Sequence, residues 1–356
     1  MKIVEPFVKE IKIADPYKKM EFAGRLCYKS QDRITENSYE RFVSTIVNRG
    51  HLSVTEHEKV TFKFNKNIFN KFDSRFISET EVGDYIYATG NIRAWKELLV
   101  DKYEDFYFKM NKTYGIFFDK NIGKENSNIE IVDYDYKKLL TFMPENEAKK
   151  HVYYTFHLRT DRATTHQLVR HRIASYSQVS QRYVNMDGFE FIVPPQIEAS
   201  GHGKLYKKTM HHIAKVYGEL SNLMIRDKVI DYYQANNIAF PMEEDAVEFF
   251  KKNHKAVYGK IEKSVIEDTR YVLPNACGTK IIVTMNARVL LHFFRTRCCS
   301  RAQWEIRDMA YEMLRQVQEV CPVVFKSAGP PCIAGPCPEG AMSCGRKAST
   351  NNKQNE

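Results

Sequence analysis

The sequence has no long apolar run, and no stretch approaches the ~18 consecutive apolar residues that a membrane-spanning helix needs. Its first residues, Met1-Lys2-Ile3-Val4-Glu5-Pro6, lack an uninterrupted apolar segment, so we expect no secretory signal. Hydrophobic residues make up 43% and charged residues 28% of the 356 residues, as in soluble globular proteins. We therefore expect a cytoplasmic protein with no membrane partner, and the composition disfavours secreted, collagen-like and wholly disordered classes.

Closely spaced cysteine pairs are also missing from the C-terminal end, where four of the eight cysteines gather at Cys321, Cys332, Cys337 and Cys344. Common zinc modules contain Cys-x2-Cys pairs, which this segment lacks. A reducing cytosol disfavours disulfides. We favour a proline-stiffened tail whose cysteines pack or stay unpaired, place a zinc site second and disulfides third, and predict no metal in the functional site.

The excess of positive over negative charge lies in two segments that contain almost no lysine. The formal net charge is +10, and residues 151–185 and 270–307 account for all of it with eleven Arg, one Lys and two acidic residues. Arginine suits bidentate recognition of phosphate and carboxylate, whereas a solvated surface is normally built from lysine. We interpret the segments as two halves of one anion-binding site. The alternative is a structural network in which carboxylates from elsewhere in the fold pair with these arginines.

The pattern of apolar residues predicts a mixed α/β protein. We divide the chain into four parts: 1–65 as an N-terminal α/β part, 66–150 as an inserted region with its own helices, 151–325 as the main core, and 326–356 as a Cys/Pro-rich tail that ends in disorder. Helical spacing predicts helices over 38–48, 162–172 and 205–235, from Ala287, and after a capping box at 300–303; strands are predicted at 59–64, 152–156, 189–193 and 281–284.

A faint internal repeat accompanies these elements. Three places show a strand, a turn that contains Thr or Asn with an Arg, and then a helix: 85–98, 152–172 and 281–297. The repeat is short enough to arise by chance, and the sequence alone leaves that open.

The most specific motif is Arg170-His171-Arg172, followed after seven residues by Ser180 and then by Arg182. If the helix runs to residue 172, Gln167, Arg170 and His171 share one face by their i, i+3 and i+4 spacing. Ser180 and Arg182 would then lie on the following loop, where backbone N–H groups are open to a phosphate. Taken alone, the basic triplet is equally typical of an exposed helix end.

A second cluster runs from Arg270 to Arg307. Within it, Arg288, His292 and Arg295 share a helical stripe, and Arg297 faces elsewhere. Asn286 is also a natural helix N-cap.

Together these residues resemble the flavin-dependent thymidylate synthases, the ThyX family. The resemblance rests on the Arg-His-Arg, seven residues, Ser pattern, on the stretch 270–307, and on Gly50-His51-Leu52-Ser53-Val54-Thr55-Glu56-His57, which is similar to that family's Gly-His-x-Ser/Thr-x-x-Glu-His segment. It covers about half of the chain. The region 66–150 and the cysteine-rich tail lie outside the family's minimal pattern.

The resemblance implies a fold and a reaction. The fold is an α+β core, in which an antiparallel sheet is flanked by helices, and the assembly is a homotetramer with active sites between subunits. The reaction is the methylation of dUMP to dTMP, with 5,10-methylenetetrahydrofolate as the carbon donor, NADPH as the reductant and FAD as the cofactor that delivers hydride. In such an enzyme the cofactor supplies the redox chemistry and the protein supplies placement and electrostatics.

By motif position, the resemblance also implies roles for individual residues. The FAD-binding set is Ser53, contributed by a neighbouring subunit, with Arg170, His171, Arg172, Gln178, Asn286, Ala287, Arg288 and His292. The dUMP-binding set is Gln167, Arg170, Gln178, Ser180, Arg182, Arg270 and Arg297. Arg297 is the catalytic candidate, because a fixed cation beside the uracil favours its anionic form. Gln178 stands where many members carry Glu, so the resemblance leaves its contact undecided between charged and neutral.

Two other classes of function compete with this interpretation. A nucleic-acid-binding protein would fit a pI near 9.0 and 43 Tyr and Phe residues, but its basic charge should spread as a Lys/Arg stripe. A metal-dependent nucleotide phosphohydrolase would use His51, His57, His166 or His171 as ligands, but the basic segments offer few carboxylates to join them. We therefore predict that nucleic acid is not a partner.

Overall fold

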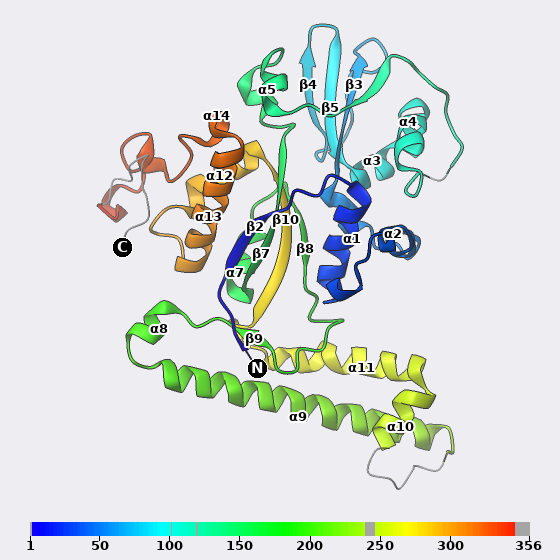
Figure 1. Ribbon diagram of the computed structural model, residues 1–356, viewed down its shortest axis with the longest axis vertical. Coiled ribbons are helices and arrows are strands. Elements are labelled where there is room, and N and C mark those ends of the chain that lie inside the picture. Colours follow the sequence, from blue (N-terminus) through cyan, green and yellow to red (C-terminus); the bar gives the residue numbers. More distant parts are fainter. Residues whose placement is uncertain (1, 101, 119, 239–245, 346–356) are drawn as a thin grey trace.

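Two four-stranded antiparallel sheets form the centre of the protein in the computed structural model, which describes residues 2–100, 102–118, 120–238 and 246–345 (Figure 1). The central sheet has the order β2-β7-β10-β8, and its strands are β2 (Phe7–Glu10), β7 (Tyr153–Asp161), β10 (Gly278–Asn286) and β8 (Ser175–Gln178). The upper sheet has the order β4-β5-β3-β6, and its strands are β4 (Ser78–Val82), β5 (Tyr85–Asn91), β3 (Lys59–Asn65) and β6 (Ile129–Val132). A short parallel pair joins β1 (Lys2–Ile3) to β9 (Glu190–Phe191).

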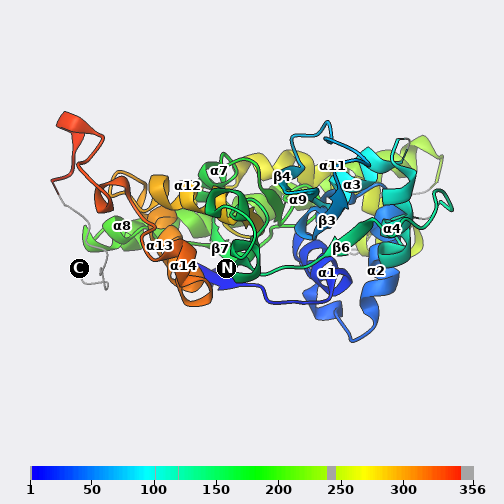
Figure 2. The same cartoon turned by 90° about the horizontal axis from the view of Figure 1, so that it is seen from above.

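Helices cover these sheets on several sides (Figures 1 and 2). The N-terminal and upper helices are α1 (Pro16–Cys27), α2 (Ser38–Asn48), α3 (Ile92–Leu99), α4 (Glu104–Tyr114), α5 (Tyr136–Leu140) and α6 (Glu145–Ala148). The remaining helices are α7 (Arg162–Leu168), α8 (Pro195–Ala199), α9 (Gly203–Ala235), α10 (Ala246–Asn253), α11 (Lys255–Thr269), α12 (Ala287–Arg297), α13 (Trp304–Val320) and α14 (Pro322–Phe325). The predicted fold class, an antiparallel sheet core flanked by helices, is confirmed.

The region 66–150 contributes strands as well as the helices that its composition predicted. Its strands β4, β5 and β6 build the upper sheet on β3, which lies before residue 66. The upper sheet therefore crosses the predicted boundary at residue 65. Strand β3 itself was predicted, because its polar and apolar residues alternate and every second side chain is buried.

Two hydrophobic cores fill the space on either side of the sheets. One packs α1 and α2 against the upper sheet and reaches α9 through Tyr217. The other packs α12 and α13 against β7 and β10. Helical spacing predicts one apolar stripe with Ile306, Met309, Ala310, Met313, Leu314 and Val317 on α13, and this is confirmed because all six are buried.

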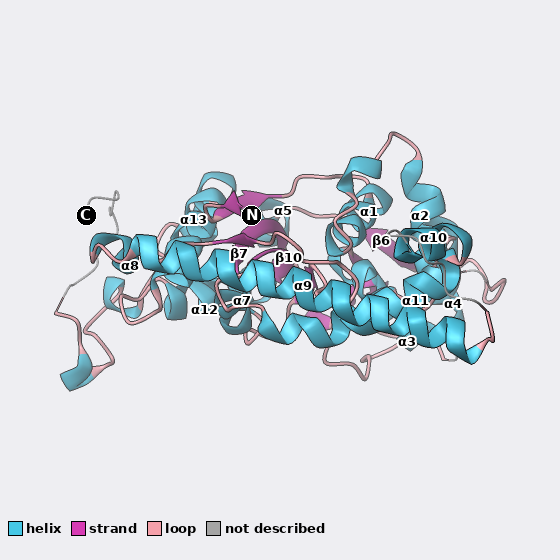
Figure 3. Ribbon diagram, turned by 90° about the horizontal axis from the view of Figure 1, so that it is seen from below, coloured by secondary structure: helices cyan, strands magenta, loops and turns pink. Residues whose placement is uncertain are grey.

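Helix α9 runs along the underside of the molecule beside α11, as Figures 1 and 3 show. A small third hydrophobic core, which includes Val229, Tyr233 and Phe250, packs the C-terminal part of α9 against α10 and α11. Helical spacing predicts one face of α9 with Ile213, Val216, Tyr217, Leu220 and Met224. Of these, Tyr217 is buried, Ile213, Val216 and Met224 are half-buried, and Leu220 is exposed. The fully buried face of α9 consists of Met210, Ala214, Tyr217, Ser221, Ile225, Val229 and Tyr233. Packing against α11 selects a face that includes small and polar residues, which an apolar pattern overlooks.

The three places of the faint repeat share one local geometry. In each, the last residue of a strand is also the N-cap of the next helix, so no loop separates the two elements. Asn91 accepts from the Ala94 N–H, Asp161 from Thr164 and Asn286 from Val289. Asn and Asp side chains satisfy the N–H groups that a helix start leaves unpaired. The predicted N-cap role of Asn286 is confirmed.

The capping box predicted at 300–303 is wrong. Helix α13 begins at Trp304, and the side chain of Gln303 caps it by accepting from the Ile306 N–H at 3.1 Å. The tail has short turns up to residue 345, and the disorder predicted for the last ten residues falls outside the described part of the chain.

Candidate functional site

The Arg170-His171-Arg172 triplet lies on a turn rather than on a helix. Helix α7 ends at Leu168, and the phenol of Tyr176 donates to the carbonyls of Leu168 and His171, at 3.0 and 2.7 Å. These carbonyls are therefore occupied where the helix would have continued. The expected helical face of Gln167, Arg170 and His171 is wrong for this reason. The turn instead exposes Arg170 and Arg172 and buries His171.

Arg297, at the end of α12, joins this turn to α7. Its Nε donates to Nε2 of His171 at 2.9 Å, and its two terminal nitrogens donate to the side chain and backbone oxygens of Gln167 at 3.4 and 3.3 Å. Burial, together with the charges of Arg297 and His292, lowers the pKa of His171 to about 4. His171 is therefore a neutral acceptor beside a fixed cation. The structure brings together Gln167, His171 and Arg297, three of the predicted site residues.

His292 and Phe293 complete this cluster on α12. The ring of His292 lies 6.0 Å from that of His171, and the ring of Phe293 packs edge-on against His171 at 4.9 Å. His292 is exposed and Phe293 is buried, so the cluster is apolar on its buried side and polar where it meets solvent.

Exposed arginines adjoin the cluster on the same two segments, Arg170 and Arg172 beside His171 and Arg288 on α12. Arg170, Arg172 and Arg288 are exposed, and no carboxylate of the described residues forms an ion pair with any of them. A structural Arg–carboxylate network therefore does not account for these three. Unpaired guanidinium groups are suited to bind phosphate. The donor set thus fits a phosphate-bearing cofactor such as the FAD that the resemblance implies.

Asn286 and Ala287 position this edge. The Asn286 amide donates to the Lys150 carbonyl at 3.3 Å, and the backbone N–H of Ala287 donates to the Val152 carbonyl at 2.9 Å. Both residues are buried, so they fix the start of α12 and leave Arg288 to face outward.

A second basic group lies where α11 ends. Arg182 forms a bond of 2.7 Å with Glu267, which raises the pKa of Arg182, and Nε of Arg270 donates to the Glu267 carbonyl at 3.1 Å. Arg162, at the start of α7, is a neighbour that the sequence argument did not select. Burial and the charge of Arg270 lower the pKa of Arg162. Its place directly after the Asp161 cap was the signal that could have identified it.

The backbone around Ser180 is less open than expected. Strand β8 separates Ser180 from the triplet, and the Ser180 N–H donates to the Cys27 carbonyl at 3.0 Å. The Arg182 N–H is directed to the Ser180 hydroxyl at 3.3 Å, and the Val184 N–H to the Ser180 carbonyl. The expectation that these N–H groups are available to a phosphate is therefore wrong, and the side chains of Ser180 and Arg182 are what the loop offers.

Gln178 lies on β8 and spans to two neighbouring elements. Its amide nitrogen donates to Thr165 on α7 at 3.0 Å and to Thr279 on β10 at 3.4 Å. Ser53, by contrast, is exposed on the 3-10 helix Leu52–His57, and in the described structure no hydrogen bond connects it to the arginine cluster.

A buried acid beneath the site was also missed. Glu305 of α13 accepts from the Thr160 hydroxyl and from the Asp161 N–H, and its second oxygen, Oε2, is buried without a partner. Burial and the charge of Asp161 raise the pKa of Glu305 to about 8. Because Asp161 caps α7, Glu305 ties the start of α13 to the helix that carries Gln167.

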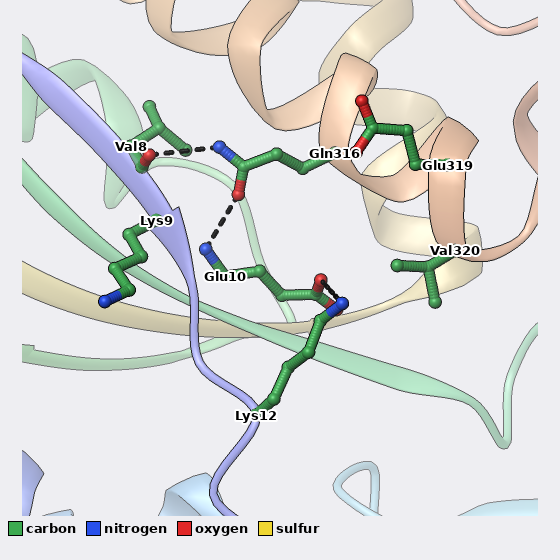
Figure 4. Close-up of a pocket in the computed structure, with 7 residues that line it drawn as sticks. All are labelled: Val8, Lys9, Glu10, Lys12, Gln316, Glu319 and Val320. Atoms are coloured by element: carbon green, nitrogen blue, oxygen red, sulfur yellow. Dashed lines mark hydrogen bonds and ion pairs between the residues drawn. The ribbon is translucent and has the colours of Figure 1, made fainter.

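One hollow in the described part of the surface contains none of the predicted site residues. This hollow, between β2 and α13, is bridged by Gln316, which bonds to the backbone of Val8 and Glu10 (Figure 4). Among the described residues, no three His, Cys, Asp or Glu side chains come close enough to hold a metal ion. Nor do they include a helix that is long and apolar enough to cross a membrane.

Comparison with known proteins agrees with the motifs. The sequence profile of the thymidylate synthase complementing protein family matches residues 11–70 and 120–323. The flavin-dependent thymidylate synthase of Clostridium tetani (strain Massachusetts / E88) is 48% identical over 201 residues, which cover 56% of this chain and 72% of that protein. The protein of the same name from Geobacter sulfurreducens is 44% identical over 203 residues, with 56% and 71% covered.

One solved structure is also similar in outline. It is a UMP/dUMP methylase from Streptomyces cacaoi with bound 5-Br dUMP, at 14% identity and a TM-score of 0.36, with 92% of this chain and 96% of that chain covered.

Proposed function

Since the chain belongs to the thymidylate synthase complementing protein family, we propose that it is a flavin-dependent thymidylate synthase that methylates dUMP to dTMP. One observation carries the proposal: Arg297 and neutral His171 meet at 2.9 Å on segments that also carry exposed arginines without a carboxylate partner among the described residues. Such a site can orient a planar anion and hold phosphates beside it.

The flavin would be FAD, held by Arg170, Arg172, Arg288 and His292, with His171, Asn286, Ala287 and Gln178 shaping that side. When bound, it would supply hydride for the reduction of the transferred carbon unit. NADPH would be the reductant and 5,10-methylenetetrahydrofolate the carbon donor. The unpaired charge of the three exposed arginines supports this assignment, because a diphosphate needs more than one cation.

The nucleotide would lie between the two basic groups. Arg182 and Arg270 would bind the phosphate of dUMP, with Ser180 beside them and Arg162 as an added cation. Gln167 and Arg297 would face the uracil. Arg297 would stabilise negative charge at N3, since a preorganised cation in a water-poor site favours the anionic ring. Gln178 already donates to Thr165 and Thr279, which leaves its carbonyl oxygen as a neutral acceptor for either ligand.

The assembly would be a homotetramer in the cytoplasm, with Ser53 reaching the flavin of a neighbouring subunit. The exposure of Ser53 supports this, because a residue buried within its own subunit could not reach another.

The test combines binding with turnover. Purified protein should show flavin absorbance or take up FAD stoichiometrically, and it should oxidise NADPH and form dTMP only when dUMP and methylenetetrahydrofolate are both present. Folded protein with no affinity for FAD would contradict the proposal. Flavin binding without dUMP-dependent turnover would limit it to a flavoprotein of another activity.

A further inference from the structure

The upper and central sheets have the same construction. Strands β4-β5-β3-β6 correspond in order to β8-β10-β7-β2, and all the pairs are antiparallel. The registers also correspond. Thr61 lies opposite Thr89 in the upper sheet, as Thr155 lies opposite Thr284 in the central one.

Hydrogen bonds repeat at the same positions. The paired threonine hydroxyls bond to each other, at 2.7 Å in the upper sheet and 2.8 Å in the central sheet. The helix that follows the middle strand starts on an Asn cap in both cases, at Asn91 and Asn286. Its first N–H donates to the carbonyl next to a histidine, from Ile92 to Glu58 and from Ala287 to Val152.

A buried histidine completes each unit. His57 contacts Thr284 Oγ1 through Nδ1 and Ser177 Oγ through Nε2, both at 2.9 Å. His151 contacts Thr89 Oγ1 through Nδ1 at 2.7 Å and Thr80 Oγ1 through Nε2 at 2.9 Å. Each imidazole therefore joins an inner strand, β10 or β5, to the edge strand beside it, β8 or β4. In both cases the histidine lies two residues before a strand of the other sheet.

The first unit runs from β2 to α3 and the second from β6 to α12, and each contributes parts to the sheet of the other. His57 precedes β3 of the upper sheet but binds the central sheet, and His151 precedes β7 of the central sheet but binds the upper one. Strands β2 and β6 are exchanged in the same way, since each pairs with the sheet of the other unit. The chain therefore contains two interlocked copies of one unit.

Only the second copy carries the candidate site. A loop over 66–77 takes the place of α7 and the Arg-His-Arg turn in the first copy. Arg93, which corresponds to Arg288, is paired with Glu56 at 2.9 Å and Glu97 at 2.7 Å. The first copy thus has its arginine neutralised where the second leaves it unpaired.

We infer that His57 is a positioning residue of the site, and that His151 is its counterpart in a copy without a site. Thr284 lies two residues before Asn286, which starts the helix of Arg288, His292 and Arg297, and Ser177 directly precedes Gln178. His57 therefore fixes β8 and β10 to each other at the point where both deliver site residues. This inference rests on the proposed function only in its choice of flavin as a probe.

The matched variants are His57→Asn and His151→Asn, which shorten equivalent side chains in equivalent surroundings. We expect both to lower the Tm by similar amounts. His57→Asn should weaken FAD binding about tenfold or more and shift the absorbance maximum of bound flavin, because a displaced donor set loses several contacts at once. His151→Asn should leave affinity and spectrum within about threefold of wild type. Equal effects of the two variants on flavin would overturn the inference.

A second pair of variants keeps the test decisive if the histidine variants do not fold. Thr284→Val and Thr89→Val each remove one hydroxyl of the corresponding histidine contacts while keeping the side-chain shape. The expectation is again an effect on flavin from Thr284→Val alone. An independent readout is the NMR titration of His171, which should change in the Thr284 variant and not in the Thr89 variant. If wild type binds no FAD, the proposed function fails, and this titration still decides the role of His57.

Discussion

Arg297 connects three segments at one point, the end of α12, the turn after α7, and α7 itself. Its role is electrostatic as well as structural, since it holds His171 as an uncharged acceptor. The motif match supplied the identities of Arg297, His171 and Gln167. Their mutual contacts were not predictable, because they depend on α7 ending at Leu168, and the bonds from Tyr176 that end it come from a strand further along the chain.

Arg297→Ala should reduce kcat for dTMP formation by about 10²–10³-fold, as expected when one preorganised donor is removed. Arg297→Lys should recover little, because lysine lacks the planar fork that reaches His171 and Gln167 together. Steady-state kinetics of folded variants check this. Arg315→Ala, which removes an exposed arginine paired with Glu312 and Glu319, serves as the control. Near-normal turnover of either Arg297 variant would contradict the catalytic assignment.

Glu305 should make stability fall as pH rises. Its pKa is raised to about 8 in the folded state, so the folded protein holds a proton that the unfolded chain releases near pH 4.5. The stabilisation is complete below pH 4.5 and is lost as the pH rises to 8, with a slope of at most about 1.4 kcal/mol per unit. Glu305→Gln mimics the protonated form and should flatten the decline between pH 6.5 and 8 in urea denaturation. Glu312→Gln, at the surface, should leave it unchanged; an unaltered slope in Glu305→Gln would refute the raised pKa.

At the scale of elements, the strand–helix junctions were the most predictable part of the fold. Alternation identified β3, and the Asn286 cap marked the start of α12, because both signals are local. Strand β5 was expected as the strand within 85–98, whereas β4 and β6 were missed, because each is stabilised by pairing with a neighbouring strand, β5 or β3, and not by its own composition. The Gln303 cap was missed for a similar reason, since glutamine is a rare N-cap and Ser300 offered the commoner pattern.

Helix α11 allows a test of whether a local change in backbone freedom alters the free energy of unfolding. Gly259 is exposed in its interior, and an added Cβ would meet nothing within 4 Å. Gly259→Ala should therefore raise the free energy of unfolding by about 0.5–1 kcal/mol, by reducing the freedom of the unfolded chain. In Gly218→Ala, on α9, the Cβ would lie 3.0 Å from Asp187 Oδ1, so the gain should be smaller. Chemical denaturation compares the two, and a destabilised Gly259→Ala would mean that α11 packs differently.

At the scale of the whole molecule, buried neutral histidines make the fold sensitive to acid. Burial lowers the pKa of His57 to about 3 and those of His151 and His157 to about 4. Their contribution is complete above pH 6.5 and is lost as the pH falls towards 4, because the unfolded chain takes up protons first. The free energy of unfolding should fall by more than about 1.4 kcal/mol per pH unit in this range.

His157 isolates this effect, since its Nε2 is buried without a hydrogen bond and its ring packs on Phe7 and Phe22. His157→Leu should reduce the acid slope in guanidinium titrations between pH 4.5 and 6.5. His212→Gln, on the exposed face of α9, should not change it. A slope equal in all three proteins would show that other groups control the acid response.

The interlocking of the two units has a consequence for synthesis on the ribosome. When residues 1–100 have been made, β3, β4 and β5 can pair, but β6, which completes their sheet, and His151, which binds its threonines, have not yet been translated. Strand β2 likewise waits for β7. The nascent N-terminal segment therefore leaves the ribosomal tunnel with the edge of β3 open and without the histidine that bonds to Thr80 and Thr89, and an open strand edge favours wrong pairing. Neither unit can close alone, and β10, which lies between β7 and β8 in the central sheet, is translated much later than either unit's other strands, so the chain stays prone to aggregation until β10 has left the ribosome.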